Sequence, residues 1–172
     1  MTLRPGRIIL LNGTSSAGKS TLASALRPAL EAQFHYYASD QLADAGFRPA
    51  DAGVRWQWRA AFFHGFHRSV AAFASAGIDL LVEHIVEEAS WKEELDQLLA
   101  PFDVFWVGVH APMAEILRRE RLRGDRHVGE ALEHLKTHSF CKYDLEVDTT
   151  APTQQNVEAI VSGWNARRIG RQ

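Results

Sequence analysis

Short apolar segments recur along the chain, and each gives way to polar or small residues. They cover residues 7–12, 34–40, 78–84, 102–110 and 143–150. Runs of this length, rich in Val, Leu, Ile and aromatic side chains, are typical of strands buried in a parallel sheet. We therefore expect a strand at each of them.

The residues between these segments show helical spacing. After Lys19, one helix face carries Leu22, Leu26 and Leu30. A long amphipathic helix is expected over residues 54–76, where Gly77 is well placed to end it. Residues 41–53 are rich in Gly, Pro, Ala and Asp, which predicts a flexible loop.

The second half of the chain continues this alternation. Residues 90–93 have the pattern of a capping box, which predicts a helix that ends before Pro101. Further helices are expected from about Pro112 and up to about His138. A last helix lays one apolar stripe on the core, made of Val157, Ile160, Val161 and Trp164.

Strands that alternate with helices predict an α/β fold, in which right-handed crossovers cover both faces of a parallel sheet. No repeat or linker divides the 172 residues, so we expect a single domain over residues 1–172.

Composition narrows the classes of function. The 19 basic and 21 acidic residues nearly cancel, which argues against a nucleic-acid or membrane partner. The one cysteine, Cys141, fits a reducing cytosol, and no stretch reaches the roughly 20 apolar residues of a membrane span. We expect a cytoplasmic protein; homo-oligomer formation is left open.

The first predicted strand leads into a phosphate-binding motif. The segment GTSSAGKS fits the pattern G-x-x-x-x-G-K-[ST] and lies between a strand and a helix. Its N–H groups and the positive helix end would hold phosphates, with Lys19 on the outer phosphates and Ser20 on Mg²⁺. The expected nucleotide-binding residues are Gly13, Thr14, Ser15, Ser16, Ala17, Gly18, Lys19, Ser20 and Thr21.

Two carboxylates follow predicted strands and so face the same crevice. Asp40 could take a proton from an attacking hydroxyl or hold Mg²⁺ through water; a helix N-cap is its structural alternative. Glu83 ends the apolar run LLVE, which resembles a Walker-B arrangement that supports the metal. We therefore predict Ser20 and Glu83 as the metal site.

An arginine cluster follows the fourth predicted strand. A solvated helix face explains Arg118, Arg119 and Arg121. Arg123 and Arg126 flank a Gly-Asp turn and are typical of a lid, placed here at residues 119–130, that closes over the nucleotide and excludes water.

Four segments together resemble the chloramphenicol 3-O-phosphotransferases and the wider chloramphenicol phosphotransferase-like P-loop kinases. They are IILLNGTSSAGKS, Asp40 at its distance from Lys19, FWVGVHAP followed by RLRGDRHVG, and KYDLEVDTT. The resemblance implies a kinase-type three-layer fold with a five-stranded parallel sheet, ATP as donor and Mg²⁺ as cofactor. It also implies that Asp40 is the general base and that Arg123 and Arg126 contact the ATP phosphates.

The acceptor is left open, because residues 41–68, where it should bind, depart from the family pattern. Trp56 and Trp58 face differently, so one is available for the cleft, whereas Phe62, Phe63 and Phe66 are expected in the core. The pairs His64/His67 and His134/His138 have metal-ligand spacing, but surface or hydrogen-bonded histidines explain them better.

The sequence thus predicts an ATP-dependent kinase acting on a hydroxyl of a small, partly apolar molecule, such as an antibiotic or a nucleoside-like compound. A metabolic kinase for a nucleoside, a sugar or a shikimate-like acid is the alternative enzyme. A nucleotide-hydrolysing switch is the rival of another class; the chain lacks the N-K-x-D guanine motif of GTPases.

Overall fold

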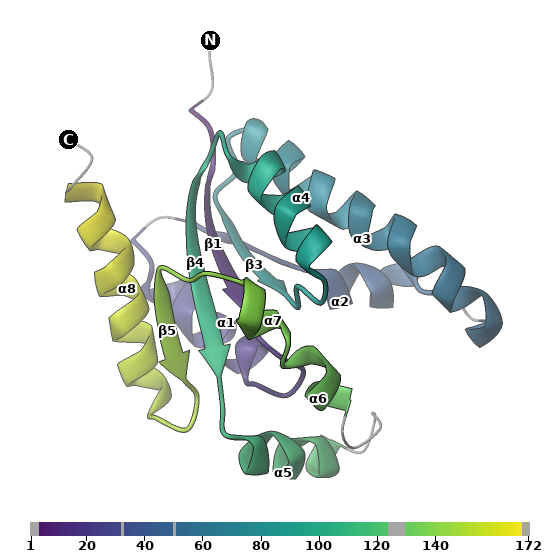
Figure 1. Cartoon of the computed structure of the whole chain (residues 1–172). Helices are drawn as coiled ribbons and strands as arrows, with labels where there is room; N and C mark the ends of the chain where they lie inside the picture. The colour runs from purple at the N-terminus through teal and green to yellow at the C-terminus, as the bar shows by residue number, and fades with distance from the viewer. Residues whose placement is uncertain (1–3, 32, 50, 124–129, 170–172) are drawn as a thin grey trace.

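A five-stranded parallel sheet forms the centre of the computed structural model, which describes residues 4–31, 33–49, 51–123 and 130–169 (Figure 1). The strands stand in the order β2-β3-β1-β4-β5. Their bounds are β1 Arg7–Asn12, β2 His35–Ala38, β3 Leu80–His84, β4 Asp103–His110 and β5 Leu145–Asp148. Each predicted strand is therefore present, although four of the five are shorter than expected.

Helices cover both faces of the sheet. On one face lie α1 (Lys19–Leu26) and α8 (Thr153–Ile169), and on the other lie α3 (Ala52–Ser75) and α4 (Ala89–Leu99). The short helices α5 (Met113–Arg123), α6 (Glu130–His134) and α7 (Thr137–Phe140) follow β4 at its carboxyl end. This confirms the predicted three-layer α/β fold.

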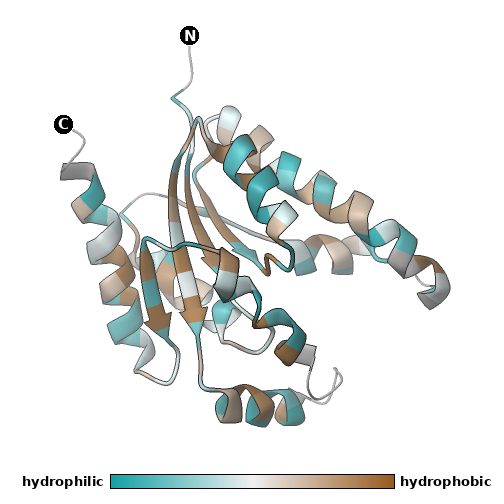
Figure 2. Cartoon of the chain, viewed as in Figure 1, coloured by the Kyte–Doolittle hydropathy of each residue, from teal (hydrophilic) through white to brown (hydrophobic). Residues whose placement is uncertain are grey.

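Because β1 is central, its apolar side chains alternate between two cores. Ile9 and Leu11 pack with α1 and α8, while Ile8 and Leu10 pack with α3 and α4. Figure 2 shows the apolar strands between helices whose polar residues lie outside. The predicted stripe of the last helix is confirmed, since Val157, Ile160 and Trp164 are buried and Val161 packs against them.

Residues 41–53 were predicted to form a loop, and this prediction was wrong for their first part. Helix α2 (Ser39–Leu42) continues into a π-helical turn, η2 (Ala43–Phe47). The Gln41 side chain accepts a hydrogen bond from the Ala38 N–H at 3.2 Å, which supports this helix start. Gly46 has a φ of 105°, a left-handed conformation that interrupts the helical geometry of this segment.

The predicted capping box at residues 90–93 was also wrong. Helix α4 begins at Ala89, and the Glu88 carbonyl already accepts from the N–H groups of Trp91 and Lys92. The Ser90 hydroxyl instead donates to the Glu88 carboxylate at 3.3 Å. The N-cap is Glu88, two residues before the predicted Ser90, so Ser90 lies inside the helix.

An ion cluster closes the amino-terminal edge of the sheet. Asp79 is 8% exposed and lies 2.6 Å from the Arg7 guanidinium, and it accepts the Arg7 backbone N–H at 2.7 Å. Arg4 adds a second ion pair. Burial alone would raise the pKa of Asp79, but the hydrogen bonds from Arg7 and the charges of both arginines outweigh it and hold this pKa below its usual value.

None of the helices that the structure describes is long and apolar enough to cross a membrane.

Candidate active site

The loop after β1 has the backbone geometry of a phosphate cradle. Gly13 lies against β4 so closely that a Cβ would stand 2.3 Å from the Val109 carbonyl oxygen, which only glycine avoids. Gly18, just before α1, has a φ of 95°, and Ser16 also has a positive φ of 58°. The loop therefore turns sharply into the helix N-terminus, whose N–H groups favour an anion.

The side chains of this loop fit a phosphate group. Lys19 is buried, and its Nζ donates to the carbonyls of Gly13 (3.1 Å) and Thr14 (2.8 Å). The Ser16 hydroxyl is buried, and within the described chain no hydrogen-bond partner is found for it. A phosphate oxygen would give that hydroxyl an acceptor, which favours the predicted nucleotide role of the loop.

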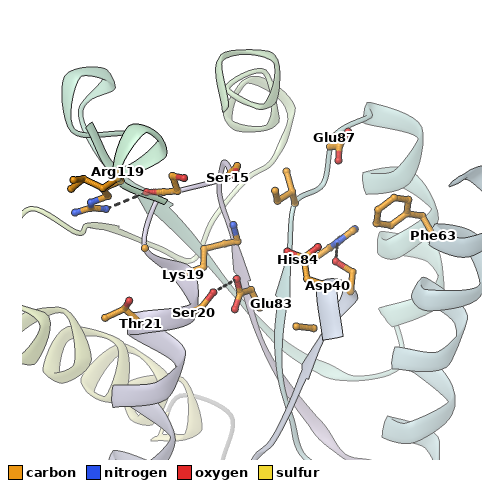
Figure 3. A pocket seen from close by; sticks show the side chains of 16 residues that line it. Ser15, Lys19, Ser20, Thr21, Asp40, Phe63, Glu83, His84, Glu87 and Arg119 are labelled. Atoms are coloured by element: carbon orange, nitrogen blue, oxygen red, sulfur yellow. Dashed lines mark hydrogen bonds between the residues drawn. The ribbon is translucent and has the colours of Figure 1, made fainter. Parts of the chain in front are cut away.

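Ser20 and Glu83 lie together, as the metal prediction requires. The Ser20 hydroxyl donates to one carboxylate oxygen of Glu83 at 2.8 Å, and the Tyr36 hydroxyl donates to the other (Figure 3). Burial and the Glu83 carboxylate raise the pKa of Tyr36, so it stays a hydrogen-bond donor.

These are oxygen ligands of the kind that Mg²⁺ prefers, and Mg²⁺ commonly uses one or two protein groups beside substrate phosphates. Within the described ranges no group of three or more His, Cys, Asp or Glu is placed to hold a metal by itself. The residues present therefore fit a metal shared with a phosphate rather than an all-protein metal site.

Asp40 lines the same cavity as the phosphate loop. It is an exposed residue in the first turn of α2, so the N-cap alternative does not hold; Ala38 precedes the helix. A cavity of about 390 Å³ is lined by Asp40, Lys19 and Glu83 together with Ser15, Ser16, Gly18, Ser20 and Thr21. Figure 3 shows Asp40 across the cavity from Ser20 and Lys19.

The side chains of the two predicted lid arginines lie outside the described residues. Arg126 lies outside the described residues, and Arg123 ends α5 without a described side chain. Arg118 and Arg121 are exposed, as expected of a solvated helix face.

Arg119 was assigned to that solvated face, and this was wrong. Its guanidinium donates to the Thr149 hydroxyl at 2.8 Å and to the Thr149 carbonyl at 3.1 Å, and it reaches the Ser16 carbonyl at 3.4 Å. The Thr149 hydroxyl donates to the Ala17 carbonyl at 2.6 Å. Arg119 thus ties α5 and the segment after β5 to the phosphate loop. Its i, i+4 ion pair with Glu115 gave no sequence signal of this role, because the exposed Arg118 pairs with the same glutamate.

A second, smaller cavity of about 240 Å³ adjoins Arg119. Its lining comes from the start of α1 and from the segment after β5: Gly18, Thr21, Leu22, Arg119, Thr149, Thr153 and Asn156. The two cavities share Gly18, Thr21 and Arg119 in their walls.

The aromatic side chains of α3 divide between the core and the cavity, which the sequence predicted in part. Phe62 and Phe66 are buried, whereas Phe63 lines the large cavity. Trp58 stacks on Phe62 with ring centroids 4.5 Å apart, and the Trp56 side chain lies outside the described residues. Of the residues predicted for the core, Phe63 is the one that belongs to the site.

The histidine pairs were expected to be surface or hydrogen-bonded, and His64 and His67 both contact the Glu94 carboxylate, while His138 Nδ1 lies 2.8 Å from the Tyr143 hydroxyl. His67 is buried and hydrogen-bonded to Glu94 at 2.8 Å. His84 lines the cavity and is 1% exposed, although it was not predicted as a site residue. Burial, the neighbouring His67 and the charges of Lys19 and Arg59 hold the pKa of His84 well below its usual value.

The sheet and this loop define a fold class: the P-loop kinase fold. The solved structure of a Mycobacterium tuberculosis APS kinase in complex with AMPPNP and APS is similar over 94% of this chain and 98% of that one, with a TM-score of 0.69 and 16% identity. Shikimate kinase from Aquifex aeolicus is similar over 95% of this chain and 99% of that one, with a TM-score of 0.65 and 15% identity. At these identities the likeness shows the fold.

Within that class, the chain belongs to the chloramphenicol phosphotransferase-like family, whose model matches residues 6–165. A Mycobacterium tuberculosis (strain ATCC 25618 / H37Rv) protein with the provisional name O-phosphotransferase is 32% identical over 171 residues. That match covers 85% of this chain and 76% of the relative. The resemblance inferred from the sequence motifs is thereby confirmed.

Proposed function

We propose that the protein is an ATP-dependent phosphotransferase that moves the γ-phosphate to a hydroxyl of a small molecule, with Asp40 as general base. One observation carries the proposal: the phosphate loop and the Asp40 carboxylate open into a single cavity. Family membership and the kinase fold support phosphoryl transfer as the reaction class.

The phosphate side of the site would be held by the loop itself. Backbone N–H groups from Gly13 to Ser20, with the Ser16 hydroxyl, bind the phosphates. Lys19 leaves the loop carbonyls to which it now donates and turns toward the outer phosphates. The nucleoside end of ATP is proposed to bind in the cavity beside Arg119 and Thr149.

Ser20 and Glu83 would hold Mg²⁺. Ser20 would bind the ion directly, and Glu83 would support it through Ser20 or through a water molecule. The direct hydrogen bond between them would open to admit the ion. Bound Mg²⁺ neutralises charge on the phosphates and makes ADP a better leaving group.

Asp40 supplies the acid–base chemistry. Its carboxylate accepts the proton of the acceptor hydroxyl while that oxygen forms its bond to the γ-phosphorus and the bond to ADP breaks. Arg123 and Arg126 are proposed to close over the phosphates, stabilise their charge and exclude water. Exclusion of water matters because water would otherwise compete with the acceptor.

The acceptor is proposed to bind on the α3 side of the cavity, within residues 41–68 and next to Phe63 and His84 (Figure 3). An aromatic ring beside hydrogen-bonding groups suits a hydroxylated molecule with an apolar part. Chloramphenicol, nucleosides, sugars and shikimate are the compounds to test first.

The test is ATP consumption by the purified chain with Mg²⁺, with and without each of these compounds, followed by product mass. We expect one class of compound to accelerate ADP release and to gain the mass of one phosphoryl group. Equal ATP consumption without any acceptor, and no phosphorylated product, would overturn the proposal in favour of a nucleotide-hydrolysing switch.

A further inference from the structure

Four polar side chains form a largely buried row that runs from α4 across α3 and β3 to α2. Glu94 Oε2 lies 2.8 Å from His67 Nδ1, and His67 Nε2 lies 3.0 Å from His84 Nε2. On the far side of its ring, His84 Nδ1 lies 3.4 Å from the Ser39 hydroxyl, next in sequence to Asp40. The proposed transfer mechanism uses none of these four groups.

The two imidazoles are enclosed by aromatic rings. His84 stacks on Trp91 with an interplanar angle of 14°, and Phe63 and Phe66 lie 5.5 and 5.1 Å from its centroid. His67 is fully buried. Burial lowers the pKa of His67, against the opposing hydrogen bond and charge of Glu94. His84 is 1% exposed, and the groups at its two ring nitrogens are the imidazole of His67 and the hydroxyl of Ser39, so no carboxylate contacts it to support an imidazolium. This setting favours two neutral rings.

If both rings are neutral, the row Glu94–His67–His84–Ser39 allows only one placement of the two ring N–H protons. The Glu94 carboxylate only accepts, so His67 carries its proton on Nδ1. Neutral His67 therefore has an unprotonated Nε2, which must accept from His84 Nε2–H. That leaves His84 Nδ1 without a proton.

The unprotonated nitrogen belongs to a residue that lines the cavity. His84 and Ser39 both contribute to its wall, and Figure 3 shows His84 beside Asp40. The Ser39 hydroxyl, at 3.4 Å, is at the long limit of a hydrogen bond and satisfies the nitrogen weakly. A buried acceptor that is weakly satisfied favours a stronger donor from a ligand.

We propose that His84 Nδ1 is a specificity-determining group that accepts a hydrogen bond from the phosphoryl acceptor, and that His67 and Glu94 are positioning residues that fix its proton on Nε2. This proposal rests on the proposed function and adds a substrate class to it. The acceptor would carry a second hydrogen-bond donor besides the hydroxyl that is phosphorylated, as diols and amino alcohols do. An ether or ketone oxygen at that place has no proton to donate, so its lone pair would repel the lone pair of Nδ1.

The proton arrangement can be measured without any acceptor. Long-range ¹H–¹⁵N spectra of the ¹⁵N-labelled protein at pH 7 report which nitrogen of each histidine is protonated. We expect the Nε2–H form of His84 and the Nδ1–H form of His67. An Nδ1–H form of His84, or an imidazolium in either ring, would overturn the proposal.

Glu94→Gln tests the positioning role, with the exposed Glu93→Gln on the same helix as matched control. An amide can donate as well as accept, so it no longer dictates the direction of the row. The Nε2–H fraction of His84 should fall in Glu94→Gln and stay unchanged in Glu93→Gln. An unchanged fraction in both variants would remove Glu94 from the account.

Recognition is tested with two small probes of the same skeleton, propane-1,3-diol and 1,3-dimethoxypropane, in the presence of AMPPNP and Mg²⁺. Only the diol has donors, so only the diol should move the His84 Nδ1 resonance. An equal effect of both probes, or no effect of either, would contradict recognition by this nitrogen.

Variants of His84 separate this idea from the proposed function. His84→Asn can place an amide oxygen near the former Nδ1 and so keep an acceptor that His84→Leu removes. In the transfer assay, with the first compound that yields a phosphorylated product, His84→Leu should raise the acceptor KM about tenfold or more over His84→Asn. The ATP KM should stay within about twofold, since one lost hydrogen bond to the acceptor leaves nucleotide binding alone.

Equal acceptor KM values in the two variants would contradict recognition while leaving phosphoryl transfer intact. Absence of any phosphorylated product would instead overturn the proposed function, and the spectra above would still decide the state of His84.

Discussion

The parallel strands carry a carboxylate at each of their two ends, the amino-terminal and the carboxyl-terminal edge of the sheet, and the two carboxylates have different partners. At the amino-terminal edge, Asp79 is held by two arginines and a backbone N–H. At the carboxyl-terminal edge, Glu83 lies near the end of β3 and is held by the hydroxyls of Ser20 and Tyr36. Both carboxylates have partners, but those partners differ in charge.

This difference indicates at which end of the strands a carboxylate can exchange its partners for a ligand. Asp79 is 8% exposed and is paired with the largely buried Arg7, so this pair stabilises the fold, and loss of Arg7 would leave the charge of Asp79 poorly compensated. A glutamate bonded to hydroxyls can exchange them for a cation more readily, since hydroxyl bonds are weaker than ion pairs. The first edge therefore serves stability and the second is suited to ligands, and each prediction below tests that division.

The largest expected effect belongs to Asp40→Asn at the carboxyl edge. Loss of a general base should lower the transfer rate by up to about 10⁴-fold. ATP affinity should stay within a few fold, because Asp40 acts on the acceptor. The measurement is single-turnover transfer beside nucleotide titration, with Asp44→Asn, one turn further on and exposed, as matched control. Full activity in Asp40→Asn would remove it as the base.

Lys19→Met should come next, with a fall in turnover of about 10²- to 10³-fold, as for the loss of one donor that stabilises transition-state charge. Steady-state kinetics with ATP measures it, and the exposed Lys136→Met serves as control. Thermal unfolding of both variants checks that each is folded at the assay temperature. Unchanged turnover in Lys19→Met would take Lys19 out of the site.

Asp79→Asn should affect folding and leave the site alone. Removal of one partner from this buried ion cluster should lower the free energy of unfolding by about 3 kcal/mol at pH 7. Urea denaturation measures it. Asp96→Asn, which breaks an exposed pair with Lys92, should change stability by about 0.5 kcal/mol or less. Equal effects of the two variants would contradict the assigned role of the amino edge.

The same cluster predicts a pH dependence. The folded-state pKa of Asp79 is depressed, so its contribution to stability is present above the unfolded value of about 3.9 and is lost as pH falls through the lower, folded value. The difference in stability between the wild type and Asp79→Asn should therefore shrink in strongly acid solution. A difference that is constant from pH 7 to the acid limit would show that ion pairing is not its source.

The smallest expected effect is that of Glu83→Gln. Loss of a carboxylate that supports a bound metal typically weakens metal affinity about tenfold or somewhat more. The Mg²⁺ concentration for half-maximal transfer should rise accordingly, while the exposed Glu88→Gln should leave it unchanged. An unaltered Mg²⁺ dependence in Glu83→Gln would separate this residue from the metal.

Sequence patterns were sufficient for the α/β order of the chain and for the phosphate loop. Strands β1, β3 and β4 contain continuous apolar runs, and the loop is a contiguous motif whose geometry needs glycine at fixed places, as Gly13 and Gly18 show. The expected meeting of Ser20 with Glu83 also followed from sequence, because parallel strands end at one edge.

What sequence missed depends on contacts between distant residues. Arg119 has the same neighbours in sequence as an exposed arginine, and only Thr149, 30 residues away, brings it to the loop. His84 acquires its orientation from His67 and Glu94, on two helices that local periodicity cannot pair. The helical turns of residues 39–47 were hidden by small and polar residues, whose propensities favour loops.

A single ³¹P NMR spectrum of the chain with ATP, Mg²⁺ and the panel of hydroxylated compounds tests the central claim most directly. Our account predicts that ATP signals are replaced by those of ADP and of a new phosphate monoester, and that Asp40→Asn suppresses the ester. ADP with inorganic phosphate alone, at the same rate with and without the panel, would contradict it.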